Sequence, residues 1–254
     1  MPAPLGLAGC IRSGSPPRHG TVRSARRRMV HPVPARRQRD PTRAPSRGNV
    51  RPKTVRHERA AARPEDFPRD GRPEIAVMGR SNVGKSSALN RLLGRPGLAR
   101  VSKAPGRTRA IHFYLVDERA WIVDLPGYGY ARVSREMRRS WQALVDAYLD
   151  RPGQPRLAIH LVDIRHDPTP LDRQLAEALR VRGIPTLVVL TKADKVSGSA
   201  SSRARARTAR ILGLEADAGP LVTSARTGAG FAALARAVDA ALAAPGQARS
   251  GAGS

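Results

Sequence analysis

The sequence is poor in cysteine, in aromatic residues and in long apolar runs. Cys10 is the single cysteine among 254 residues, so an internal disulfide or a cysteine-based zinc site is excluded, which fits a reducing compartment. Aromatic residues make up only 4%. No apolar run approaches the ~20 residues that a helix needs to cross a bilayer, and the N-terminal stretch lacks the apolar core of a secretory signal. We therefore expect no stable membrane association and a cytoplasmic protein.

Acidic residues are also scarce. The chain has 20 Asp and Glu against 46 Lys and Arg, a formal net charge of +26. This excess favours polyanionic partners, with RNA or a ribonucleoprotein surface as the natural candidate. Coding bias toward arginine is an equally good explanation. Charge alone predicts salt-sensitive association and no sequence-specific recognition.

The composition divides the chain into three parts. Residues 1–53 are rich in Arg, Pro, Ser and Gly, with Asp40 as the only acid, and are predicted to be a disordered basic tail. This tail is an RNA-touching segment, an organelle transit peptide or an over-extended start of translation; the three readings stay open. Residues 54–244 have the pattern of a folded domain, and residues 245–254 are predicted to be a flexible tail.

Short apolar runs alternate with amphipathic segments in the folded part. This order predicts an α/β domain with a mostly parallel six-stranded sheet, helices on both faces and one antiparallel edge strand. The antiparallel strand follows from the short connection at 117–119, which is the right length for a hairpin. The predicted strands are 74–78, 110–116, 120–124, 157–163, 186–190 and 220–223. The predicted helices are 83–93, 134–149, 169–182, 200–212 and 228–243.

A glycine-rich loop follows the first of these strands. Gly79 is separated by four residues from Gly84, Lys85 and Ser86, between the apolar run 75–78 and a helix. Strand, glycine loop and helix form the context of a phosphate-binding loop (P-loop). The glycines let backbone N–H groups and the helix N-terminus converge on phosphate oxygens. Lys85 is expected to reach the β/γ-phosphates, and the Ser86 hydroxyl to hold Mg²⁺.

Two further segments have the features of a γ-phosphate switch. The strand 120–124 ends in Asp124-Leu125-Pro126-Gly127, where a carboxylate can hold Mg²⁺ through water and a glycine N–H can approach phosphate. The segment 102–108 ends in Thr108, whose hydroxyl is of the kind that supplies a second Mg²⁺ ligand. Each is common by itself, and it is their order after the P-loop that gives them weight.

Guanine recognition is indicated at the next strand end. Thr191-Lys192-Ala193-Asp194 follows the strand 186–190. The Asp194 carboxylate can accept two hydrogen bonds from guanine N1–H and N2–H₂, donors that adenine does not offer together. The Lys192 stem can lie against the base, and backbone N–H groups of 223–225 can meet guanine O6. These features argue against an ATPase or a small-molecule kinase.

With these motifs in order, the sequence resembles translation-factor-type GTPases of the TrmE-Era-EngA-EngB-Septin class, and more narrowly the EngB (YihA/YsxC) ribosome-biogenesis GTP-binding proteins. The segments 128–131, Tyr-Gly-Tyr-Ala, and 165–168, an Arg-His-x-Pro pattern, are its most specific parts. A departure is Arg109-Ala110 in place of a more usual Gln-Leu. The matching stretches are 73–75, 79–87, 102–108, 124–131, 162–169, 171–172 and 191–195.

The resemblance implies a Mg²⁺-dependent GTP/GDP switch that assists large-subunit assembly, contacts ribosomal RNA and is linked to division and septation. It also implies a monomer, with Ser86 and Thr108 as Mg²⁺ ligands. The implied GTP contacts are Gly79, Arg80, Ser81, Asn82, Val83, Gly84, Lys85 and Ser86; Gly106, Arg107, Thr108, Arg109 and Ala110; Asp124, Leu125, Pro126 and Gly127; Thr191, Lys192, Ala193 and Asp194; and Thr223, Ser224 and Ala225.

Catalysis is expected to depend on Lys85, Thr108 and Asn82. Tyr128 stands where Ras-like enzymes have the Gln that orients water, which predicts slow intrinsic hydrolysis. A potassium ion held near Asn82 is one compensation; the alternative is that Asn82 only braces the loop. A competing function is a basic RNA-binding scaffold with a structural nucleotide. The helix 134–149 has a basic face that either contacts RNA or is simply solvated.

Overall fold

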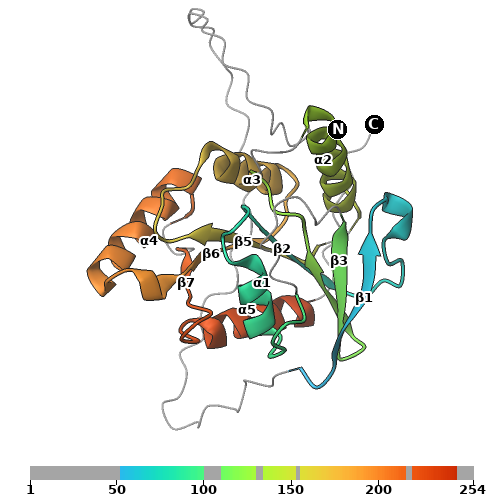
Figure 1. Ribbon diagram of the computed structural model, residues 1–254, viewed down its shortest axis with the longest axis horizontal. Helices are drawn as coiled ribbons and strands as arrows, with labels where there is room; N and C mark the ends of the chain where they lie inside the picture. Colours follow the sequence, from blue (N-terminus) through green and yellow to red (C-terminus); the bar gives the residue numbers. More distant parts are fainter. Residues whose placement is uncertain (1–51, 100–109, 130–133, 153–154, 216–218, 245–254) are drawn as a thin grey trace, which may run out of the picture. The chain divides into compact units, whose positions relative to one another are not determined.

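The computed structural model describes residues 52–99, 110–129, 134–152, 155–215 and 219–244 (Figure 1). Nearly all of the predicted tails, 1–53 and 245–254, lie outside these ranges. The whole predicted switch segment 102–108 and Arg109 also lie outside them. Among the described residues, no helix has the length and apolarity to span a membrane.

The described residues build one seven-stranded sheet with the strand order β1-β3-β4-β2-β5-β6-β7 (Figure 1). β2 is central and pairs in parallel with β4 on one side and β5 on the other. The carboxyl ends of these three strands therefore meet at one edge, where ligands bind in such sheets. The strands are β1 (Val55–Ala61), β2 (Glu74–Gly79), β3 (Ile111–Val116), β4 (Ala120–Asp124), β5 (Leu157–Asp163), β6 (Thr186–Thr191) and β7 (Leu221–Val222).

The mostly parallel α/β class is confirmed, but the prediction of six strands with an antiparallel edge strand is wrong in two details. β1 was missed, and β3 is antiparallel to both β1 and β4, so the edge is β1. The segment Val55–Ala61 buries only Ala61. Main-chain pairing to β3 holds this strand in the sheet, and such pairing leaves no apolar alternation in the sequence.

The predicted hairpin between β3 and β4 is confirmed. The main-chain N–H of Arg119 donates to the carbonyl of Val116 at 2.9 Å. Asp117 and Glu118 between them have positive φ angles of 48° and 55°. Two central residues in this conformation make the turn whose twist matches that of paired strands.

Helices cover both faces of the sheet, as expected. Side chains alternate along β2: Ile75 and Val77 pack with α1 and α5, whereas Ala76 and Met78 pack on the face of α2 and α3. α4 packs beside α3 over β6. The predicted helices agree with the structure except at their ends. They are α1 (Lys85–Leu92), α2 (Arg135–Leu149), α3 (Pro170–Val181), α4 (Gly198–Leu212) and α5 (Phe231–Ala243), with short 3₁₀ helices η1 (Pro64–Asp66) and η2 (Ala193–Lys195).

Candidate nucleotide-binding site

The glycine loop between β2 and α1 has the backbone conformation of a phosphate cradle. Gly84 has a φ of 102° at the start of α1, and Asn82 has a φ of 62°. A Cβ on Gly79 would lie 2.9 Å from the carbonyl oxygen of Leu161, so only glycine fits where the loop leaves the sheet. The first N–H groups of α1 then face the loop, where an anion is stabilised.

Lys85, the first residue of α1, forms an ion pair with Asp124 at the end of β4. The side chains are 12% and 7% exposed, so both charges depend on each other for compensation. The register explains the meeting, because Val77 of β2 lies opposite Asp124. Bound phosphates offer Lys85 a competing anion, and the Asp124 carboxylate is then free to serve a cation.

The oxygen donors at this end of the sheet suit Mg²⁺. Mg²⁺ prefers oxygen ligands and usually takes only one or two from the protein beside phosphates and water. Ser86 follows Lys85 at the start of α1, and Asp124 lies against Lys85. Among the residues that the structure describes, no cluster of three His, Cys, Asp or Glu side chains offers a metal cage. The other predicted ligand, Thr108, is outside the described ranges.

The end of β6 is bonded directly to the glycine loop. The Thr191 hydroxyl donates to the carbonyl of Val83 at 2.7 Å. Lys192, with a φ of 61°, donates from Nζ to the carbonyl of Asn82 at 2.7 Å. Its Nζ also pairs with Asp163 at 2.8 Å. The predicted base-recognition and phosphate-binding segments therefore form one hydrogen-bonded unit.

Asp194 lies beside the last strand in a position to accept hydrogen bonds from a base. The Ser224 hydroxyl donates to its Oδ1 at 2.7 Å, and Arg226 Nε donates to Oδ2 at 2.9 Å. The hydrogen bond from Ser224 and the contact with Arg226 lower the pKa of the Asp194 carboxyl, so it is ionised at neutral pH. Thr223 and Ser224 are buried, and the main-chain N–H of Ala193 donates to the carbonyl of Thr223 at 3.0 Å. Segments 191–194 and 223–225 are thus brought together as predicted.

The segment after β4 lies directly on the glycine loop. The main-chain N–H of Ser81 donates to the carbonyl of Tyr128 at 2.9 Å. A Cβ on Gly127 would be 3.2 Å from the nitrogen of Ser81. Leu125 is fully buried, and its N–H donates to the carbonyl of Val77 at 3.1 Å. Asp124 and Gly127 therefore flank the loop from the β4 side.

The remaining predicted nucleotide contacts lie in the segment 106–110. Gly106, Arg107, Thr108 and Arg109 lie outside the described residues, and Ala110 is a bend before β3. Sequence reasoning missed a buried cluster of Tyr128, His160 and Asp172 beside the loop. One local signal was available, since Thr169 and Asp172 have the spacing of a helix capping box, which the structure contains.

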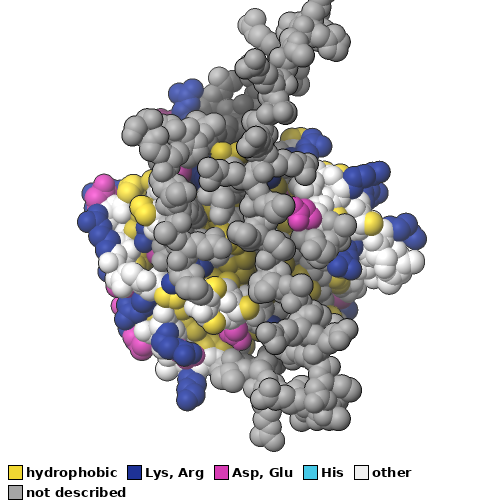
Figure 2. All heavy atoms as spheres, turned by 180° about the vertical axis from the view of Figure 1, so that it is seen from behind, with side chains coloured by type: hydrophobic (Ala, Val, Ile, Leu, Met, Phe, Trp, Pro, Cys, Tyr) yellow, Lys and Arg dark blue, Asp and Glu magenta, His cyan; other side chains and the backbone are white. Residues whose placement is uncertain are grey.

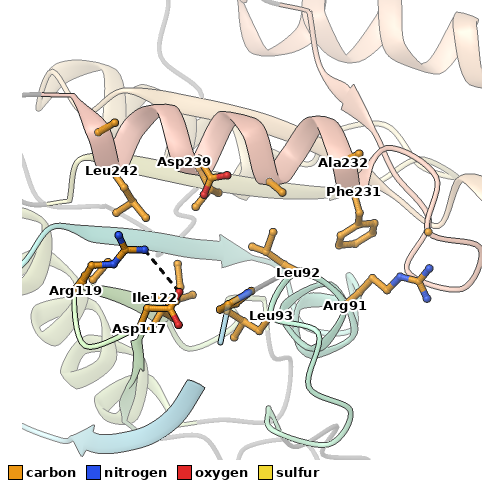
Figure 3. A pocket seen from close by; sticks show the side chains of 17 residues that line it. Arg91, Leu92, Leu93, Asp117, Arg119, Ile122, Phe231, Ala232, Asp239 and Leu242 are labelled. Carbon is orange, nitrogen blue, oxygen red and sulfur yellow. Dashed lines mark ion pairs between the residues drawn. The ribbon is translucent and has the colours of Figure 1, made fainter. Parts of the chain in front are cut away.

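Of two large hollows in the described part of the structure, only one adjoins the glycine loop. One of about 480 Å³ is lined by Arg80, Ser81, Asn82, Asp163 and Lys192, among others, and so adjoins the glycine loop. Another, of about 670 Å³, lies between α5 and the end of α1. Figure 3 shows Phe231 and Leu242 of α5 on one side of it, with Leu92 of α1 and Arg119 and Ile122 of the β3–β4 hairpin on the other. None of the predicted site residues lines this second hollow.

A glycine loop at the end of the central strand, a Lys–Asp pair beside it and a Thr-Lys-x-Asp segment hydrogen-bonded to that loop form the arrangement of a P-loop GTPase. A profile of the family described as 50S ribosome-binding GTPase matches residues 74–192. The probable GTP-binding protein EngB of Pelotomaculum thermopropionicum is 47% identical over 171 residues, 67% of this chain and 86% of that protein. The chain belongs to the EngB family of GTP-binding proteins.

Two further comparisons agree. The probable GTP-binding protein EngB of Gemmatimonas aurantiaca is 48% identical over 176 residues, 68% of this chain and 84% of that protein. A crystal structure of a probable GTP-binding protein EngB superimposes with a TM-score of 0.58 and 26% identity, covering 66% of this chain and 98% of that one. As a member of this family, the protein is an enzyme that hydrolyses GTP to GDP and phosphate.

Proposed function

We propose that this GTPase is a molecular switch that assists assembly of the large ribosomal subunit, in the cytoplasm, and through it supports normal division and septation. The ribosomal part is supported by the description of the matching family, 50S ribosome-binding GTPase. The observation that carries the switch is the bonding of the base-recognition loop to the phosphate loop by Thr191 and Lys192. Because of these hydrogen bonds, the segment proposed to bind the base and the loop proposed to bind the phosphates form one rigid unit.

In this proposal each residue of the site has a defined task. The α1 N-terminus and Lys85 stabilise the phosphate charge, and Asp194 accepts the guanine N–H donors while Ser224 orients its carboxylate. Ser86 and Thr108 hold Mg²⁺, with Asp124 close by. When bound, Mg²⁺ neutralises charge on the β- and γ-phosphate oxygens. Residues 106–110 and 223–225 complete the nucleotide contacts.

Intrinsic hydrolysis is proposed to be slow. The hydroxyl of Tyr128, the residue after Gly127, is hydrogen-bonded to Asp172 in the interior and so is not offered to an attacking water. A K⁺ ion beside Asn82 is proposed to supply the missing positive charge. The positive φ of Asn82 has an independent explanation, because asparagine tolerates this conformation better than most residues. The ion therefore needs its own test.

A basic surface supports a ribonucleoprotein partner. α4 has four arginines and no acidic residue, and Arg203, Arg207 and Arg210 share one exposed face through i, i+4, i+7 spacing. We call these three the α4 arginine face. Arg207 pairs with Asp167, whereas Arg203 and Arg210 have no acidic partner among the described residues. Lys and Arg side chains also gather at the right-hand edge of Figure 2, on the side where α4 lies.

The test is cosedimentation with purified large ribosomal subunits at several salt concentrations, with GDP or a non-hydrolysable GTP analogue. Wild-type protein is expected to bind preferentially with the GTP analogue. Replacing the α4 arginine face by glutamine should weaken binding and reduce the salt slope by about 2–3, because each phosphate contact contributes about 0.9. A variant with Arg63, Arg119 and Arg180 changed to glutamine loses the same charge elsewhere and serves as the control. Binding that is independent of nucleotide would refute the switch.

A further inference from the structure

A buried polar cluster connects the segment after β4 with β5 and α3. The Tyr128 hydroxyl donates to Asp172 Oδ1 at 2.7 Å and lies 2.9 Å from His160 Nε2. Asp172 and His160 are 2% and 0% exposed. None of the nucleotide contacts proposed above involves these three side chains, so the cluster has no role yet in binding or hydrolysis.

The donors and acceptors present in this cluster determine which atoms carry the protons. Because the Tyr128 hydroxyl proton goes to Asp172, His160 donates to the tyrosine oxygen from Nε2. Nε2 therefore carries a proton, and His160 Nδ1 is buried without a hydrogen-bond partner among the described residues. The other Asp172 oxygen accepts from the Thr169 N–H at 2.7 Å and the Thr169 hydroxyl at 2.6 Å.

Asp172 carries the negative charge of the cluster. Burial opposes ionisation of Asp172, but the hydrogen bonds from His160, Thr169 and Tyr128 lower the pKa of its carboxyl to about 2. Burial and the neighbouring carboxylate raise the pKa of Tyr128 well above its usual value. The tyrosine is therefore a donor to a carboxylate that stays ionised, and the buried hydrogen bonds of Tyr128 and Asp172 resist rearrangement.

Tyr128 is held at its other end by the glycine loop. Its carbonyl accepts the Ser81 N–H at 2.9 Å, and the preceding Gly127 lies in contact with Ser81. One residue thus links the phosphate loop to α3 and β5, with its main chain on the loop and its hydroxyl in the interior. Whatever fixes Tyr128 also fixes Gly127, whose N–H is the group expected to approach the γ-phosphate.

We propose that Tyr128 is a positioning residue, whose hydroxyl, held by Asp172 and His160, sets the Asp124–Gly127 segment over the phosphate loop and thereby favours nucleotides that have a γ-phosphate. The inference rests on the proposed function only in taking Gly127 as a γ-phosphate contact. Tyr128 itself neither touches the nucleotide nor orients water. Without its hydroxyl, the segment has to be ordered by the ligand, at a cost to affinity.

The test is Tyr128→Phe, which keeps the ring and removes the hydroxyl. Dissociation constants are measured for GDP and for a non-hydrolysable GTP analogue by fluorescence titration. The GTP analogue is expected to bind about tenfold more weakly, the loss of one hydrogen bond to a charged group. GDP, which has no γ-phosphate, is expected to change less than twofold. Tyr148→Phe removes another fully buried tyrosine hydroxyl, in α2, and should leave both constants unchanged.

A pair of variants at His160 provides a second readout. His160→Gln retains an N–H near the position of Nε2 and should preserve the wild-type preference, whereas His160→Leu should shift it in the direction of Tyr128→Phe. Equal weakening for both nucleotides in Tyr128→Phe would overturn the positioning role. So would unchanged constants in Tyr128→Phe and His160→Leu proteins that fold with the wild-type melting temperature. Failure of the wild-type protein to bind guanine nucleotides would refute the proposed site instead.

Discussion

Removal of the Arg151 guanidinium is expected to destabilise the domain strongly. Arg151 donates to both carboxylate oxygens of Glu74, at 2.8 and 3.3 Å, and to the carbonyl of Pro68 at 2.9 Å. It also stacks over Phe67 and Tyr148. Glu74 begins β2 and is 1% exposed. Without Arg151, the Glu74 carboxylate would lose its positive partner in the interior, at the start of the strand that leads to the phosphate loop.

The magnitude follows from this burial. Breaking a buried ion pair on one side costs about 3–5 kcal/mol, which for a domain of this size lowers the melting temperature by roughly 6–20 °C. Arg151→Met is therefore expected to lose this amount. The double variant Glu74→Met/Arg151→Met should lose much less, because no buried charge remains. Urea unfolding followed by circular dichroism gives the four free energies of the double-mutant cycle.

The pH dependence of the stability loss provides the result that could refute this prediction. Burial already raises the pKa of Glu74 above its ordinary value of 4.5 in spite of Arg151, and loss of Arg151 raises it further. The folded variant then retains a proton that the unfolded chain releases, so its stability falls as pH rises above about 4.5. The cost of Arg151→Met should accordingly be larger at pH 8 than at pH 5. An equal cost at both values, or a loss below about 1 kcal/mol, would show that the ion pair is not what stabilises this end of β2.

Three other predictions concern the site and its surroundings. Asp194→Asn should change the preferred base from guanine to xanthine, because the amide donates where the carboxylate accepts. Competition binding with GTP and XTP measures this preference. An unchanged preference would remove Asp194 from base recognition. GTP turnover should be faster in KCl than in NaCl at equal ionic strength, and Asn82→Ala should abolish the difference; identical rates in wild-type protein would refute the potassium site. Asp172 has a folded pKa of about 2 against an ordinary 3.8, so it contributes about 2 kcal/mol of stability above pH 4 that is lost as pH falls toward 2. Acid unfolding of Asp172→Asn should lack this step, and a wild-type slope in the variant would contradict the assignment.

The phosphate loop could be predicted from sequence because its determinants are local. Gly79 and Gly84 are required by backbone conformation and close approach, and the flanking strand and helix have clear apolar periods. The segments that contain Asp124 and Asp194 could be placed at strand ends because each follows a short apolar run. A parallel sheet brings such ends to one edge. Local sequence therefore suffices for the conformation of the glycine loop and for the positions of the strand ends.

Long-range partners were not predictable in this way. Tyr128 was recognised from sequence as part of the Tyr-Gly-Tyr-Ala segment and as a residue in the place of glutamine. Nothing in its own segment shows that its hydroxyl reaches Asp172 on α3. Likewise, Lys192, the residue after β6, pairs with Asp163 at the end of the adjacent strand β5. β1 was missed because its neighbour β3, and not its own side-chain pattern, places it in the sheet.

The edges of the described sheet restrict how another macromolecule can associate with this protein. A sheet edge is a template for an added strand unless it is short, charged or irregular. β1 has Arg56, His57, Glu58 and Arg59 along it and an irregular register between His57 and Arg59, and β7 at the opposite edge has only two residues. Both borders are thus unsuited to β-augmentation and to edge-to-edge aggregation. Recognition is left to loops and helix faces, which also form the proposed nucleotide site.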